Sequence, residues 1–250
     1  MKKLGIYGDS WVNHAYVNIN TDAKPGPIHE CWSYHPILRD KFDVTIHSTR
    51  GQDFYSTYSV FKKTHMNFDR IVFVVTDSLR TSFEIYGKSF LITPKDIETD
   101  FENNKADAEL HIKDAKKLEE VVRLLNSLKN YYLYINRDEL MDAGVARLVE
   151  EIKMIRPDAE IFPAFQNRFI PGFKLIEIAS YESTTLGVDK NLHEFIDLRH
   201  AHMTKENNEI FAKIVRRGLE GEKIELYLDM FQKPSIDERN KYFIPINNGT

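Results

Sequence analysis

A serine follows a short apolar run near the start of the chain, in the sequence Leu4-Gly5-Ile6-Tyr7-Gly8-Asp9-Ser10. A hydroxyl just beyond a strand of an open parallel sheet faces the crevice in which such folds place reacting groups. Serine is a weak nucleophile by itself, and it needs a base beside it and a group that orients the base. Asp197, His200 and His202 are the candidates for these two roles. Together the four residues predict nucleophilic acyl chemistry at Ser10.

Two further strand-like runs end in polar residues. The alternating run 42–46 precedes Gly51, and the continuous β-branched run 70–75 precedes Thr76-Asp77. Because the carboxyl ends of parallel strands meet at one edge of a sheet, we expect Ser10, Gly51 and Thr76 to line the same crevice.

Strands and helices alternate along the rest of the chain. We expect further strands at 131–135 and 160–165, and helices at 31–40, 55–65, 108–130, 140–155 and 205–217. This alternation implies right-handed βαβ units, which build an α/β fold of three layers, α/β/α, around a mostly parallel, doubly wound sheet.

One domain is expected over residues 1–220. Within it, residues 84–110 are charged and irregular, and we predict an insertion or lid there. Residues 221–250 hold one short apolar stretch followed by a tail rich in proline and asparagine. We therefore expect a C-terminal extension that packs on the domain.

Composition narrows the classes of partner. The chain has 250 residues, 42% of them hydrophobic, which is enough for one large core. Its net charge of −4 and pI of about 6.2 argue against a nucleic-acid partner, because duplex-binding proteins present a basic face. The single cysteine, Cys31, excludes an internal disulfide and a thiolate metal cluster. No signal peptide or membrane span is evident, so we expect a soluble, cytoplasmic protein with no membrane partner, although a virus particle also fits.

The order and spacing of these residues resemble the SGNH, or GDSL-type, hydrolases over residues 3–217. Gly8-Asp9-Ser10 matches the first block of that family, and Gly51 matches the glycine of the second. Asp197-Leu198-Arg199-His200 matches the last block, Asp-x-x-His. The third block is Gly-x-Asn-Asp in the family, and here Thr76 stands in place of its asparagine. The resemblance implies a flavodoxin-like arrangement of the sheet.

The resemblance also implies a role for each residue. Ser10 is the expected nucleophile, a histidine of the last block the base, and Asp197 the group that orients the base. The backbone N–H groups of Ser10 and Gly51, with the side chain of Thr76, are the expected oxyanion hole. Donors of this kind stabilise the transition state by about 3–4 kcal/mol each. A glycine suits the second position, because the backbone can approach the substrate there without a side chain.

Two histidines compete for the role of base. His200 has the family's three-residue separation from Asp197. His202 begins the run His202-Met203-Thr204, which resembles the family's approach to its final helix. We favour His202 and keep His200 as the alternative base.

The function expected on this basis is a serine esterase or acyl hydrolase that needs no cofactor and no metal. Its substrate is a small ester, and the family suggests an O-acetylated glycan. Trp11, Asp77 and Arg80 are the candidate substrate contacts. Trp11 could form a substrate wall with Tyr16 and Trp32, although Trp32 is expected in the core. The structural alternatives for the other two are Thr76-Asp77 as a helix cap and Arg80 in an ion pair. Asp9 is expected to accept hydrogen bonds from nearby backbone and to fix the turn.

Two other classes of function remain open. A non-catalytic binding or structural protein on the same fold, viral in origin for example, would explain why Thr76 replaces asparagine. A zinc hydrolase would use His200 and His202 with Asp197 as metal ligands, but it leaves the Ser10 block unexplained. A serine hydrolase depends on Ser10, whereas a zinc enzyme depends on the metal.

Overall fold

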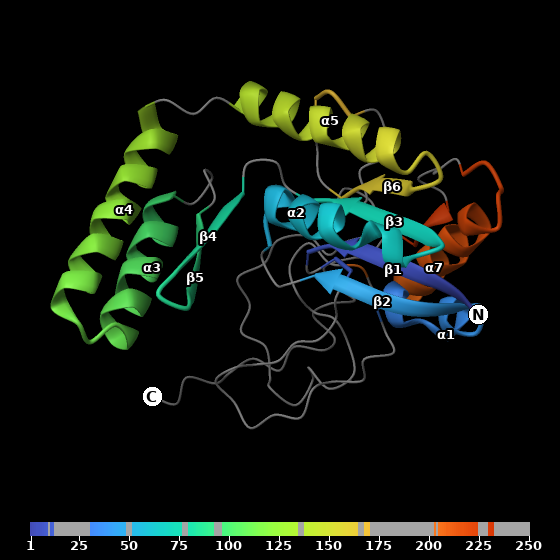
Figure 1. Ribbon diagram of the computed structural model, residues 1–250, viewed down its shortest axis with the longest axis horizontal. Coiled ribbons are helices and arrows are strands. Elements are labelled where there is room, and N and C mark those ends of the chain that lie inside the picture. Colours follow the sequence, from blue (N-terminus) through green and yellow to red (C-terminus); the bar gives the residue numbers. More distant parts are fainter. Residues whose placement is uncertain are drawn as a thin grey trace.

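The computed structural model describes residues 1–9, 11–12, 31–48, 52–76, 80–92, 97–134, 138–164, 168–170, 203, 205–224 and 230–232. Its centre is a four-stranded parallel sheet in the order β2-β1-β3-β6. The strands are β1 (Lys2–Gly8), β2 (Phe42–Ser48), β3 (Arg70–Val75) and β6 (Glu160–Pro163). The chain moves from β1 to β2 on one side and then to β3 on the other, so the direction of winding reverses beside β1 (Figure 1). Doubly wound sheets bind their ligands at the carboxyl edge beside such a reversal.

The strand register brings the carboxyl ends of β1, β2 and β3 to one edge. Gly8 pairs with Ser48 of β2, and Tyr7 pairs with Phe73 of β3. Glycine is required at position 8, because a Cβ atom there would lie only 2.8 Å from Cγ1 of Val12. The predicted parallel arrangement of these three strands is confirmed.

Helices cover both faces of the sheet. One face carries α2 (Phe54–Thr64), followed by the short η3 (His65–Asn67), and α5 (Asp138–Ile155). The other face carries η2 (Trp32–Tyr34), α1 (Pro36–Arg39) and α7 (Lys205–Leu219) (Figure 1). Successive residues of a strand point to opposite faces, so the central strands contribute to a core on each side of the sheet. Leu4, Ile6, Val72 and Val74 pack in the core with α7. Tyr7, Ile71, Phe73 and Val75 pack in the core with α2 and α5. The α/β fold with helices on both sides of the sheet is confirmed.

A separate lobe, defined by residues 81–134, follows β3. It consists of a hairpin, β4 (Thr81–Ile85) and β5 (Lys88–Ile92), and of two helices, α3 (Ile97–His111) and α4 (Ala115–Tyr134). The lobe has its own core, formed by residues that include Phe90, Ile92, Phe101, Val121 and Leu125. The expectation that residues 84–110 are irregular is wrong, whereas their role as an insertion or lid stays a prediction.

Two further expectations in this region are corrected. The predicted strand at 131–135 is wrong over 131–134, which form the last turn of α4. Val121, Leu125 and Tyr132 continue one helical stripe, and their packing on the lobe core outweighs the local β propensity of the tyrosines. The predicted single helix over 108–130 is two helices, because the Asp114 carboxylate accepts the N–H groups of Lys116 and Lys117 and so begins α4.

The helices expected over 140–155 and 205–217 are confirmed, with bounds within two residues. None of the helices among the described residues combines the length and the apolar character needed to cross a lipid bilayer. The division into a domain over 1–220 and an extension over 221–250 stays a prediction.

Candidate functional site

The turn after β1 is held by the carboxylate of Asp9, which is fully buried. Its Oδ1 accepts the backbone N–H of Trp11 at 3.0 Å, and its carbonyl accepts the N–H of Val12 at 3.1 Å. These two bonds tie Trp11 and Val12 to Asp9 at the end of β1. The prediction that Asp9 bonds local backbone is confirmed.

The second oxygen of the same carboxylate pairs with an arginine from far along the chain. Arg80 Nη1 lies 2.9 Å from Asp9 Oδ2, and the arginine side chain is only 17% exposed. A carboxylate removed from water needs such a partner, because an unpaired buried charge is costly. The ion-pair alternative for Arg80 is therefore shown, and its contact with a substrate stays a prediction.

Thr76 lies one residue beyond β3, and it is 2% exposed. Its hydroxyl is buried and makes no hydrogen bond to any of the described residues. An unsatisfied buried hydroxyl costs about 1–3 kcal/mol and calls for an explanation. The alternative of Thr76-Asp77 as a helix cap concerns residues 77–79, which lie outside the described residues, and it stays a prediction.

Ser48, at the end of β2, is a site residue that the sequence interpretation missed. It pairs with Gly8 in the sheet, and its hydroxyl is also buried without a hydrogen-bond partner among the described residues. Ser48 is the last residue of β2 and Thr76 directly follows β3, so these two hydroxyls lie at the ends of the two strands that flank β1. The sequence signal was available, because Val44, Ile46 and Ser48 alternate toward one face of the sheet.

A stack of aromatic rings lies on the face of the sheet that α2 and α5 cover; Tyr7 and Phe73 are fully buried in it, and His47 is half-buried. The ring of His47 stacks on Tyr7 with 4.8 Å between centroids, and Tyr7 stacks in turn on Phe73 at 5.8 Å. Burial lowers the pKa of His47 and raises the pKa of Tyr7 to about 12. Both rings are therefore neutral near pH 7 and act as packing groups.

Asp53 fixes the start of α2, two residues after Gly51. Its carboxylate caps the helix by accepting the N–H and the hydroxyl of Ser56, at 2.8 and 3.0 Å. This cap fixes the start of α2 at residue 53.

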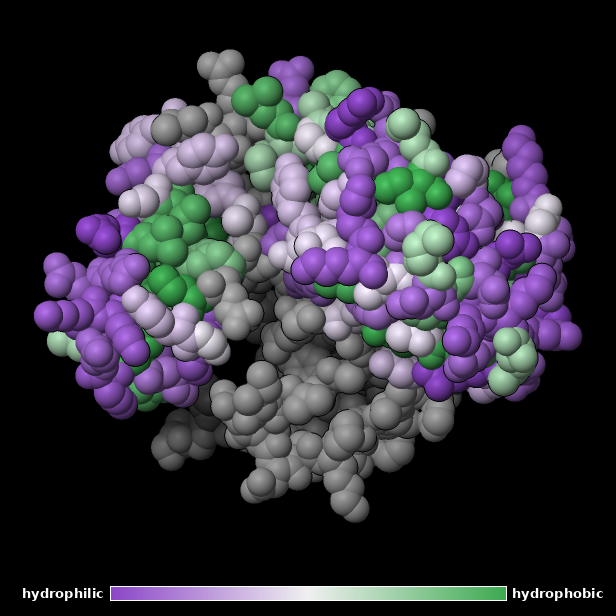
Figure 2. Space-filling view, viewed as in Figure 1, coloured by the Kyte–Doolittle hydropathy of each residue, from purple (hydrophilic) through white to green (hydrophobic). Residues whose placement is uncertain are grey.

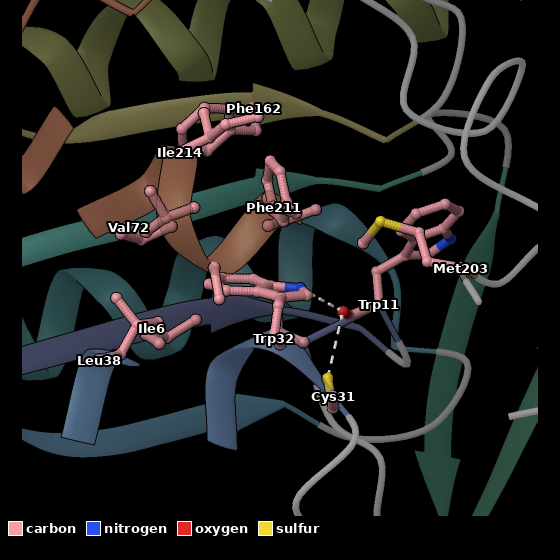
Figure 3. Packing of buried hydrophobic residues seen from close by; sticks show 14 of the residues in the cluster. Ile6, Trp11, Cys31, Trp32, Leu38, Val72, Phe162, Met203, Phe211 and Ile214 are labelled. Carbon is pink, nitrogen blue, oxygen red and sulfur yellow. Dashed lines mark hydrogen bonds between the residues drawn. The ribbon is translucent and has the colours of Figure 1, made fainter. Parts of the chain in front are cut away.

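Trp11 belongs to the core between the sheet and α7 (Figure 3). Its side chain is 3% exposed, and its carbonyl accepts the indole N–H of Trp32 at 2.8 Å. The sequence suggested that Trp11 contacts the substrate, but in the structure its side chain has almost no accessible surface for such a contact. Met203 lies in the same cluster and near Trp11 in Figure 3, and its carbonyl accepts Asn208 Nδ2 at 3.2 Å.

The remaining predicted site residues lie outside the described residues: Ser10, Gly51, Asp77, Asp197, His200 and His202. Their roles, and the zinc alternative built on the two histidines, stay predictions. No family model matches this chain, and no curated protein matches it significantly. The function must therefore follow from the residues and the fold.

Proposed function

We propose that this protein is a serine hydrolase of the SGNH type, which cleaves small esters through an acyl-enzyme on Ser10. The observation that carries the proposal is the buried, unsatisfied hydroxyl of Thr76 at the carboxyl edge of the sheet. Asp9 lies at the same edge and holds Trp11 and Val12 through its hydrogen bonds. A buried polar group without a partner calls for an explanation, and a ligand bound at the reversal of winding would supply the partner.

The positions of the two strand ends support this assignment. Thr76 follows β3 by one residue, and Ser10 follows β1 by two. β1 and β3 are adjacent and in register, and a Cβ at Gly8 would lie 3.2 Å from Cβ of Val74. Nucleophile and donor therefore come from neighbouring strands, as a shared site requires.

In the proposed reaction, the hydroxyl oxygen of Ser10 attacks the ester carbonyl while a histidine removes its proton. The Thr76 hydroxyl and the backbone N–H groups of Ser10 and Gly51 donate to the oxygen that becomes negative. The histidine then protonates the departing alcohol, and an acyl-serine remains. A water, deprotonated by the same histidine, releases the acid and restores Ser10.

The packing around α7 supports His202 as the base. Met203 is buried in one cluster with Trp11, and the chain bonds these two residues directly to His202 and Ser10. Asn208 of α7 holds Met203 and also accepts the backbone N–H of Trp32, so this corner is fixed from two sides. We expect His202→Ala to reduce turnover by about 10³-fold or more, and His200→Ala to leave most activity.

Hydrolysis of p-nitrophenyl acetate tests the proposal. Wild type should exceed Ser10→Ala by about 10³-fold or more in kcat. The control variant is Ser127→Ala, on the exposed side of α4, where the hydroxyl bonds only the Arg123 carbonyl among the described contacts. This control should match wild type. Equal, slow hydrolysis by wild type and Ser10→Ala would favour the competing proposal of a non-catalytic binding protein. The presence of Thr76 in place of the family's asparagine is the observation that favours this alternative.

A further inference from the structure

The lobe of residues 81–134 is joined to the sheet domain over a narrow region. Its core is made of its own residues, and none of its described helices and strands forms an extensive contact with an element of the sheet domain. Figure 1 shows the lobe beside the domain, and Figure 2 shows mostly hydrophilic residues along the outer edge of the lobe. A unit attached in this way can change its orientation at low cost unless specific contacts hold it.

The base of the lobe lies beside the Asp9 ion pair. Arg80, which donates to Asp9, is bonded to Thr81, the first residue of β4. The hydroxyl of Thr81 is hydrogen bonded to that of Tyr132, in the last turn of α4. The start and the end of the lobe are thus tied together next to Arg80. Any movement of the lobe about its base therefore acts on this guanidinium.

We propose that Arg80 is a positioning residue, through which the lobe sets the geometry of the turn that carries Ser10; this rests on the proposed function. The Asp9 carboxylate links the two, because one oxygen accepts from Arg80 and the other accepts the N–H of Trp11. Asp9 is fully buried, so its charge cannot exchange the arginine for water without a large penalty. A substrate that contacts the lobe thereby acts on the nucleophile through one carboxylate.

A double-mutant cycle on Arg80 and Asp9 tests the proposal. The measurements are kcat and KM for p-nitrophenyl acetate, the rate of labelling by a fluorophosphonate, and hydrogen exchange of the Trp11 amide. Arg80→Ala should lower kcat and the labelling rate by about tenfold or more, with KM within threefold. It should also speed exchange of the Trp11 amide by about tenfold, whereas Arg80→Lys and added guanidinium should recover part of each effect.

Two variants sharpen the result. In an Asp9→Asn background, removal of Arg80 should have little further effect on the turn, because the proposed route from the arginine to the turn runs through that carboxylate. The matched control is Arg70→Ala, which removes an arginine paired with Asp158 at 3.7 Å, at the opposite end of β3. This control should leave the turn and the labelling rate unchanged.

Wild-type Trp11 exchange and labelling in Arg80→Ala would overturn the proposal, and so would independent, multiplying effects of the two substitutions. If Arg80→Ala does not fold, the double variant, which leaves no unpaired buried charge, and Arg80→Lys decide the question. If wild type neither hydrolyses the ester nor takes the label, the proposed function fails. Exchange of the Trp11 amide then still decides whether Arg80 holds the turn.

Discussion

Replacing Thr76 by valine should raise the free energy of unfolding and lower kcat. Both effects follow from the loss of one atom, the hydroxyl oxygen. Valine keeps the shape of the side chain and exchanges the hydroxyl for a methyl group. In the folded protein that hydroxyl is buried without a partner, so an apolar replacement removes a penalty of about 1–3 kcal/mol. For a chain of this size, a gain of 1 kcal/mol raises Tm by about 2–4 °C.

The same substitution removes one donor from the proposed oxyanion hole. Loss of one such donor lowers kcat by about 10²–10³-fold, and a threonine hydroxyl, with its shorter reach than a carboxamide, should lie near the lower end. Urea unfolding gives the free energy of unfolding, and hydrolysis of p-nitrophenyl acetate gives kcat. Thr76→Ser keeps the hydroxyl and serves as the control for activity. A destabilised Thr76→Val variant, or one with the kcat of wild type, would refute the reasoning.

Three further substitutions test the structure around the turn. Gly8→Ala should destabilise the protein by about 1–3 kcal/mol, because the new Cβ would lie 2.8 Å from Cγ1 of Val12, and urea unfolding measures the loss. Asp53→Ala should cost about 0.5–2 kcal/mol through the lost cap of α2, seen in the same assay, and an unchanged midpoint would show that the cap contributes nothing. Burial raises the pKa of Tyr7 from 10 to about 12. The contribution of the protonated phenol to the free energy of unfolding is therefore fully present below pH 10, and it is lost as the pH rises toward 12. Tyr7→Phe should flatten this alkaline decline of about 2–3 kcal/mol in the free energy of unfolding, and an equally steep decline in the variant would contradict the assignment.

The strands of the sheet could be predicted, because the pattern of apolar residues in each strand follows directly from which of its residues are buried. After Arg70, the run from Ile71 to Val75 is apolar and buried throughout, as expected of a central parallel strand. The hairpin of the lobe could not be predicted in the same way. Its turn is formed by Tyr86 and Gly87, both with positive φ, and tyrosine rarely takes that conformation. The last turn of α4 was not predicted as helix, because packing against the lobe core, and not local propensity, decides its structure.

The candidate site shows the same division between local and distant effects. The bond from the Trp11 N–H to Asp9 spans two residues, and the composition of the Gly-Asp-Ser turn indicates it. The partner of Asp9, Arg80, lies 71 positions further along the chain, and the fold of that whole stretch decides the pairing. Whether the hydroxyls of Ser48 and Thr76 are satisfied depends on every atom around them, and no spacing in the sequence records that.

Covalent labelling with a fluorophosphonate, followed by peptide mapping, tests the central claim most directly. The probe reacts with an activated serine and not with an ordinary hydroxyl, since it needs a deprotonated oxygen and an oxyanion hole. The account predicts one modified residue, Ser10, with labelling lost in Ser10→Ala and strongly slowed in Thr76→Val. An unlabelled wild-type protein, or a label on any other residue, would contradict it.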